Sequence, residues 1–72
     1  MQYIDTFSGN GTQTVFLLTG IPIDPSQTAV QVDLVPKNYG SDFDIQTHYV
    51  IFIDSPNIGF DNIKVEYQGN PI

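Results

Sequence analysis

The chain has 72 residues, no cysteine and a formal net charge of −6, from two lysines against eight acidic residues. A chain of this length forms one domain with a marginal core. No disulfide can reinforce that core, so contacts between subunits are the expected source of further burial. The acidic balance argues against nucleic acid or an anionic membrane as a partner. No apolar run approaches the roughly 20 residues of a membrane span, and the N-terminus lacks the pattern of a signal peptide.

The first predicted strand covers residues 3–7, and the turn-prone segment "SGNG" separates it from a second strand at 14–18. Its Gly9, Asn10 and Gly11 admit three interpretations. A phosphate-binding loop needs a helix N-terminus behind it, and none is expected here. Asn10 also matches the acceptor pattern for N-glycosylation, which requires a secretory route. We favour a turn whose glycines supply the backbone angles.

Further along the chain, apolar residues alternate with polar ones, which is the signature of a half-buried strand. Further strands are predicted at 29–35, 43–46, 49–53 and 62–67, separated by turn clusters rich in Gly, Pro, Asn and Ser. This spacing predicts an all-β single domain over residues 1–72, a small antiparallel sandwich or barrel of about six short strands without a helix. The alternation places these residues in the core: Val30, Val32, Leu34, Ile63, Val65 and Tyr67.

Residues that could carry chemistry are few. His48 is the one side chain suited to act as a base near neutral pH, but the sequence offers it no cysteine and no recognisable serine partner, so we expect neither catalysis nor a catalytic residue. The loop from Asn38 to Asp44 gathers oxygen ligands of the kind that calcium prefers. It lacks the order of acids and glycine found in a calcium-binding hand, so we expect solvated turn carboxylates there, with no metal and no cofactor.

The segment "HYVIFI" at 48–53 is unusual because five apolar residues follow one another without alternation. Two interpretations remain open from the residues alone. A strand buried on both faces has this pattern, and so does a strand that buries one face inside the domain and the other against a second chain.

The order of the motifs resembles a family of small β domains found in bacteriophage virion proteins. The resemblance runs from Phe7 to Tyr67, through the segments "FSGNG", "TVFLL", "AVQVDLV", "FDI", "YVIFIDSP" and "NIGFDNIKVEY". That family has a Gly-Asp-Gly-type turn, a Phe-x-Leu strand, a valine strand, an Ile-x-Phe strand closed by proline, and a final Ile-x-Val-x-Tyr strand. It occurs in tail fibres, head fibres and capsid-associated proteins, often at the end that docks on the particle.

The resemblance implies roles for particular residues. Gly9, Asn10 and Gly11 correspond to the turn and Pro56 to the strand terminator. Inward positions that it adds to the core are Phe16, Leu18, Val50 and Phe52. Tyr49, Ile51 and Ile53 then point outward, where the family usually has threonine or another polar residue, and we expect them to contact a neighbouring subunit. The sequence departs from the family at residues 46–48, which lack the expected glycine, and at the loop "PKNYGSD".

In function, the resemblance implies a structural protein of the virion, assembled in the host cytoplasm. We expect a head decoration or cement protein, because the short chain leaves no room for a fibre shaft or a receptor-binding tip. Expected partners are the major capsid protein or other virion proteins, and copies of the chain itself in a homo-oligomer, with a trimer favoured. Edge-strand pairing with a neighbour is one expected contact. The alternatives are a tail, collar or fibre-anchoring adaptor and, from another class, a carbohydrate-binding module that presents Tyr3, Tyr39 and Tyr67.

Overall fold

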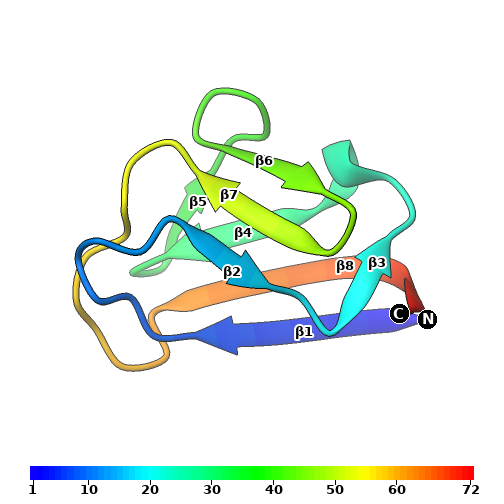
Figure 1. Ribbon diagram of the computed structural model, residues 1–72, viewed down its shortest axis with the longest axis horizontal. Helices are drawn as coiled ribbons and strands as arrows, with labels where there is room; N and C mark the ends of the chain where they lie inside the picture. Colours follow the sequence, from blue (N-terminus) through cyan, green and yellow to red (C-terminus); the bar gives the residue numbers. More distant parts are fainter.

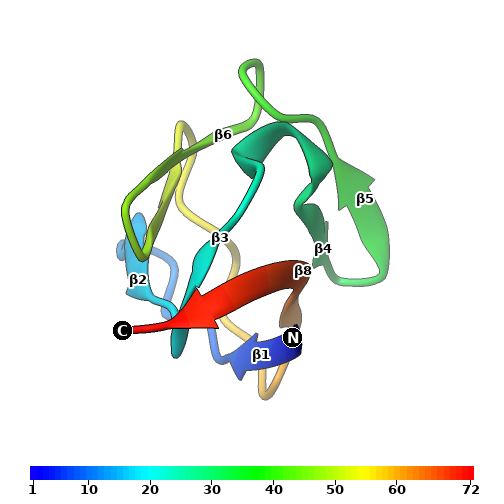
Figure 2. The ribbon, with the colours of Figure 1, turned by 90° about the vertical axis from the view of Figure 1, so that its right-hand side faces the viewer.

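The structure is a computed structural model that describes residues 1–72, and it consists of two antiparallel sheets packed face to face (Figure 1 and Figure 2). The larger sheet has the order β1-β8-β4-β5, with β3 paired to the end of β8; its strands are β1 (Gln2–Phe7), β3 (Gly20–Pro22), β4 (Ala29–Val32), β5 (Val35–Lys37) and β8 (Ile63–Pro71). The smaller sheet has the order β2-β7-β6, formed by β2 (Val15–Leu17), β6 (Phe43–Gln46) and β7 (Tyr49–Phe52). The predicted all-β antiparallel sandwich is therefore confirmed.

Two short strands, β3 and β5, were not predicted. Each has three residues and contains a proline, Pro22 in β3 and Pro36 in β5. Because proline cannot donate a ladder hydrogen bond, it occurs in sheets at edges and strand ends. In a sequence, proline therefore indicates a turn, and for this reason the two strands were missed. One turn of 3-10 helix, η1 (Pro25–Gln27), leads into β4 and begins at Asp24, whose side chain accepts a hydrogen bond from the Ser26 N–H.

β8 is the central strand of the larger sheet. Its residues from Ile63 to Gln68 pair with β1 on one side, and those from Ile63 to Glu66 pair with β4 on the other. Alternate side chains of β8 point into the sandwich, which is why Ile63, Val65 and Tyr67 are buried.

The core between the sheets consists of eleven buried side chains: Phe16, Leu18, Val30, Val32, Phe43, Ile45, Val50, Phe52, Ile63, Val65 and Tyr67. It contains nine of the ten predicted core residues. Phe43 and Ile45, both on β6, complete it. Phe16 and Phe52 meet edge to face with ring centroids 5.8 Å apart, so the aromatic side chains of the smaller sheet pack directly against each other.

Leu34 is the predicted core residue that lies outside the core, and its assignment was wrong. The alternation of the valine strand continues through "VDLV", but β4 ends at Val32 and the chain reverses at Asp33 and Leu34, which have φ of 53° and 68°. Two successive residues with positive φ form the hairpin turn that suits the twist of the strands. Leu34 therefore stands at the tip of the β4–β5 hairpin.

The loop with Gly9, Asn10 and Gly11 is not a tight turn between adjacent strands, because it crosses from β1 in one sheet to β2 in the other. The Asn10 side chain organises the loop by accepting hydrogen bonds from the backbone N–H groups of Thr12 and Gln13 at 2.9 and 2.7 Å. Gly11 has a φ of +86°, a conformation that favours glycine.

This β1–β2 loop is fastened to the β7–β8 loop, which runs beside it (Figure 1). The Gly11 N–H donates to the carbonyl oxygen of Pro56 at 3.1 Å, and the Gly9 N–H donates to Asn62 Oδ1 at 2.9 Å. A Cβ on Gly9 would collide with the backbone carbonyl of Asn57. Pro56 is buried four residues after β7 ends at Phe52, so its part in the structure is to join the two loops.

Candidate interaction surface

The outward side of the smaller sheet carries a continuous row of apolar side chains. Alternation along β2 and β7 sends Phe16, Val50 and Phe52 inward and leaves the alternate residues on the outside. We call this surface the sheet face; it consists of Val15, Leu17, Tyr49, Ile51 and Ile53.

The register brings the two rows of the sheet face together, because Val15 is paired with Ile51 and Leu17 with Tyr49. Leu17, Tyr49 and Ile53 are 56%, 37% and 64% exposed. Ile51 is half-buried, since it lies in the central strand between Val15 and Asp44. The three predicted contact residues do lie on an outer surface, and β2 adds two neighbours that the sequence analysis did not name. The alternation of "TVFLL" around Phe16 and Leu18 was the signal that could have identified them.

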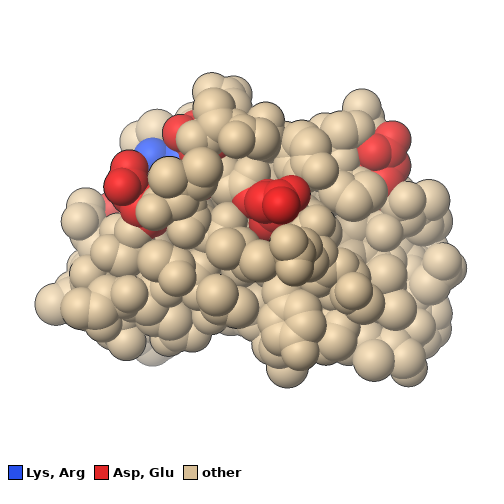
Figure 3. All heavy atoms as spheres, turned by 45° about the horizontal axis from the view of Figure 1, so that its top comes forward, with Lys and Arg blue, Asp and Glu red and all other residues tan.

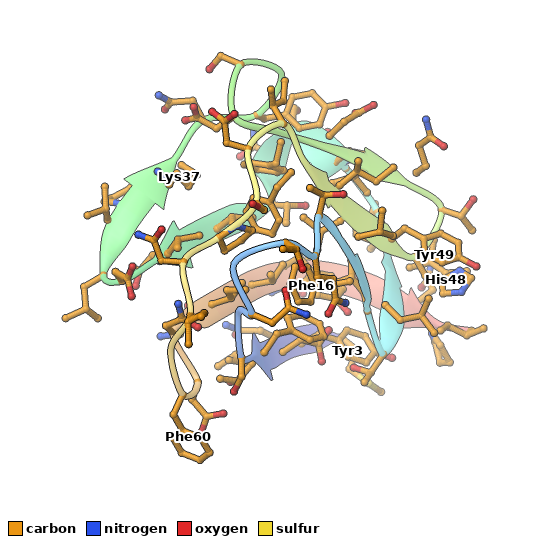
Figure 4. All side chains as sticks on the ribbon, turned by 60° about the vertical axis from the view of Figure 1, so that its left-hand side comes forward. Tyr3, Phe16, Lys37, His48, Tyr49 and Phe60 are labelled. Atoms are coloured by element: carbon orange, nitrogen blue, oxygen red, sulfur yellow. The ribbon has the colours of Figure 1, made fainter.

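Polar side chains of β6 border the sheet face. Asp44 and Gln46 of β6 are paired with Ile51 and Tyr49, and they form a polar margin of the kind that surrounds an interface. His48, in the β6–β7 turn, stacks on Tyr49 with ring centroids 4.4 Å apart (Figure 4). The His48 Nδ1 atom is buried without a hydrogen-bond partner. The contact that the His48 ring makes is thus with the aromatic ring of Tyr49.

A second group of apolar side chains is exposed at the end of the molecule where the β4–β5 hairpin and the β7–β8 loop meet. We call it the loop end; it consists of Leu34, Ile58 and Phe60, each at least 80% exposed. Leu34 and Phe60 line a hollow of about 460 Å³. In Figure 4 the ring of Phe60 projects away from the body of the protein and lies far from Tyr49. The loop end and the sheet face are thus separate surfaces.

Acidic side chains gather beside the β5 strand. Asp33, Asp42 and Asp54 line a hollow of about 250 Å³ together with Lys37, and Figure 3 shows acidic groups spread over one face of the molecule. The Asp42 carboxylate accepts a hydrogen bond from the backbone N–H of Asn38 at 2.7 Å, which shapes the loop. No group of three or more His, Cys, Asp or Glu side chains is placed to hold a metal ion.

One polar cluster is buried inside the sandwich, around the carboxylate of Asp5. Asp5 lies on β1 and accepts hydrogen bonds from the Tyr67 hydroxyl at 2.7 Å, from the Thr19 hydroxyl at 2.6 Å and from the Thr19 N–H at 3.1 Å. The Tyr67 hydroxyl in turn accepts from the Gly20 N–H at 2.9 Å. Burial, together with the hydrogen bond to Asp5, raises the pKa of Tyr67 to about 12. The cluster fastens the β2–β3 connection to β1 and β8.

The three tyrosines considered for carbohydrate binding do not form a shared platform. Tyr67 is buried, and Tyr3 stacks on it with centroids 5.3 Å apart and planes inclined by 11°. Tyr39 lies elsewhere, against Phe43 of β6, with centroids 5.8 Å apart. Tyr3 and Tyr67 therefore contribute their rings to the interior, and Tyr39 is the exposed one of the three.

Comparison with known proteins gives no match: no protein-family model, no curated protein and no solved structure is similar to this chain. None of its helical segments has the length and apolar character needed to cross a membrane.

Proposed function

We propose that this chain is a structural protein of a bacteriophage virion, a decoration or cement protein that lies on the head and stabilises it through the sheet face. The order of motifs from Phe7 to Tyr67, which resembles that of the small β domains of virion proteins, supports the assignment to this class of protein. The observation that carries the proposal is the row of exposed apolar side chains on β2 and β7, because contiguous apolar surface on a small domain marks an interaction site.

The exposed side chains of the sheet face suit repeated contacts of modest strength. An interface of ordinary size buries about 800 Å² on each partner, which is just under a fifth of the 4350 Å² that the chain exposes. Complete burial of a large apolar side chain contributes about 1.5–3 kcal/mol. Leu17, Tyr49 and Ile53 are already partly buried, so together they would contribute only a few kcal/mol. Stable attachment would then come from many copies bound side by side.

Substitutions on the sheet face test the contact directly. Leu17→Thr combined with Ile53→Thr should leave the domain folded, because both side chains are exposed, and should weaken its binding to heads at least about tenfold. The matched control is Ile58→Thr combined with Phe60→Thr, which likewise removes two exposed apolar side chains, but from the loop end. If the control weakens binding and the sheet-face variant does not, the loop end is the docking surface and the proposal is wrong in its site.

Deletion of the gene from the phage that encodes the chain tests the location. We expect heads that lose mass and resist heating less well than wild-type heads, and addition of the purified protein should restore both properties. Heads of unchanged mass and heat stability with missing tails or fibres would identify an adaptor instead. Specific binding of the isolated domain to a glycan array would support the carbohydrate-binding alternative and contradict a purely architectural role.

A further inference from the structure

The β1 strand is an open edge of the larger sheet, and the backbone N–H and C=O groups on its outer side have no hydrogen-bond partner. β1 pairs with β8 alone. Met1 and Gly69 exchange two backbone hydrogen bonds, of 2.8 and 3.3 Å. Because such exchanges alternate along an antiparallel ladder, the backbone groups of Tyr3, Asp5 and Phe7 also face β8. Those of Gln2, Ile4 and Thr6 face away from it, and no hydrogen bond to them is formed elsewhere in the chain.

This edge lacks most of the features that protect edge strands from pairing. Proteins usually shield an edge with proline, lysine, a bulge or a very short strand. The edge strand β5 has three residues, of which Pro36 and Lys37 are two. β1 has six residues without proline, lysine or arginine. Its single charged residue, Asp5, points inward, which can by itself protect an edge. Here the Asp5 carboxylate is held in the interior by Tyr67 and Thr19, and none of these hydrogen bonds uses the free backbone groups of the edge.

We propose that β1 pairs with β1 of a second copy of this chain, antiparallel and about a two-fold axis through Ile4, so that the two larger sheets become one continuous sheet. The free groups are spaced for this pairing. In that register Ile4 faces Ile4 of the other copy, and Gln2 of each copy faces Thr6 of the other. All three pairs are of the type that exchanges two hydrogen bonds, so an isologous contact satisfies every free group on both edges.

The charges around the edge also permit a second copy to approach, although each chain carries a net charge of −6. The exposed side chains of β1 are uncharged. On the neighbouring strand, Lys64 and Glu66 lie beside Thr6 and Ile4 and form an ion pair of 3.5 Å, so their charges cancel. The Gln2 side chain donates to Glu66 Oε2 at 3.0 Å. Ile4 is 56% exposed, so the pairing would also bury its side chain against its symmetry mate.

The oligomeric state and the amide exchange of the purified protein test the pairing together. Sedimentation equilibrium should give twice the 8.0 kDa of the chain, or a higher even multiple. The amides of Gln2, Ile4 and Thr6 should exchange slowly in concentrated samples and rapidly on dilution. The amides of Tyr3 and Asp5 should be slow in both. A protein that stays monomeric up to about 1 mM, or an odd-numbered assembly such as a trimer, would overturn the proposal.

Two variants identify the contact. Ile4→Lys places a charge at the centre of the edge. Ile4→Pro removes a backbone N–H that β8 does not use. Each variant should raise the dissociation constant of the dimer at least about tenfold and leave the circular dichroism spectrum unchanged. Ile23→Lys is the matched control, since Ile23 is 62% exposed and directly follows β3, which pairs with β8 and not with β1. This variant should change the dissociation constant by less than about twofold. Dimers that persist in both Ile4 variants, or amide protection that requires another protein, would refute self-pairing.

Discussion

Replacing Asp5 with alanine should destabilise the domain by about 2–4 kcal/mol, although Asp5 has no cationic partner. The carboxylate accepts three hydrogen bonds, from the Tyr67 hydroxyl and from the N–H and hydroxyl of Thr19. A hydrogen bond to a charged group contributes about 1.5–3 kcal/mol, and a buried donor left without an acceptor costs a similar amount. The Tyr67 hydroxyl is the buried donor among the three, and after the change its remaining acceptor is the carbonyl oxygen of Gly20 at 3.5 Å.

The other losses are smaller. Thr19 is an exposed residue, so water can replace the acceptor for its donors, and we count at most about 1 kcal/mol for them. Removal of a buried carboxylate also relieves the cost of its desolvation, which keeps the total near the middle of the range. A domain of 72 residues has a free energy of unfolding of about 4–11 kcal/mol, so the alanine variant would lose a large part of it.

Asp5→Asn is the matched variant, because it keeps the shape of the side chain and one acceptor oxygen. The amide oxygen can accept from the Tyr67 hydroxyl and the Thr19 N–H, and the amide nitrogen can donate to the Thr19 hydroxyl. We therefore expect a loss of only about 1 kcal/mol, from the missing charge. A double-mutant cycle with Tyr67→Phe should show a coupling of about 1–2 kcal/mol, since without the carboxylate the hydroxyl has lost its main acceptor.

The free energies come from urea denaturation followed by circular dichroism, with linear extrapolation to water. The order of stability should be wild type, then Asp5→Asn, then Asp5→Ala. A free energy of unfolding for Asp5→Ala within about 0.5 kcal/mol of wild type, which is the effect of a neutral surface change, would refute the reasoning. So would an additive cycle, because it would mean that Asp5 and Tyr67 do not depend on each other.

Two further predictions concern Tyr67 and the hairpin tip. The pKa of Tyr67 is raised to about 12 from the 10.0 of an unperturbed tyrosine, so its stabilising contribution is complete below pH 10 and is lost as the pH rises to about 12; the full loss is about 3 kcal/mol. Absorbance titration of the tyrosines measures the pKa, and unfolding curves across this range measure the loss of stability. A stability that is the same at about pH 9 and at about pH 12 would contradict the prediction. Leu34→Gly should stabilise the domain by about 0.5–1 kcal/mol, because a leucine at a φ of 68° is strained by about 1–2 kcal/mol and glycine returns part of that in backbone entropy. Val35→Gly, inside β5, is the control that should destabilise it, and a destabilised Leu34→Gly would show that Leu34 packs in solution.

The core of the sandwich could be predicted because a period of two is a local property of the sequence. The alternation alone was enough to predict the burial of five residues, namely Val30, Val32, Ile63, Val65 and Tyr67. The same rule failed at Leu34, where the alternation continues although the chain reverses. The turn at Asp33 and Leu34 has positive φ at both residues without the Asn-Gly sequence that usually announces it, so nothing local marked the end of the strand.

The candidate surfaces required tertiary information. The outward direction of Tyr49, Ile51 and Ile53 followed from the resemblance, but the neighbourhood of Leu17 and Tyr49 depends on β2 pairing with β7, which joins residues far apart in the sequence. Asp5 was missed as a buried residue. It has the same parity as Tyr3 and Phe7, both partly buried against the core, and an acid at an inward position was the available signal for a buried hydrogen-bonded cluster.

The two proposed contacts use different sheets, so one chain can make both at the same time. The sheet face belongs to the β2-β7-β6 sheet, and the open edge belongs to β1 at the border of the larger sheet. A two-fold pairing through Ile4 gives each dimer two sheet faces, and a dimer that docks on a repeating surface binds through both, which raises its avidity without any new contact. If the sheet face instead joins copies into the trimer that the resemblance implies, a two-fold axis that meets the three-fold axis at a right angle joins two trimers into a closed hexamer with dihedral symmetry. Loss of the edge by Ile4→Lys would then leave trimers, whereas loss of the sheet face by Leu17→Thr and Ile53→Thr would leave dimers. The masses of the two variants therefore distinguish a chain that builds its own closed assembly from one that relies on the particle to arrange its dimers.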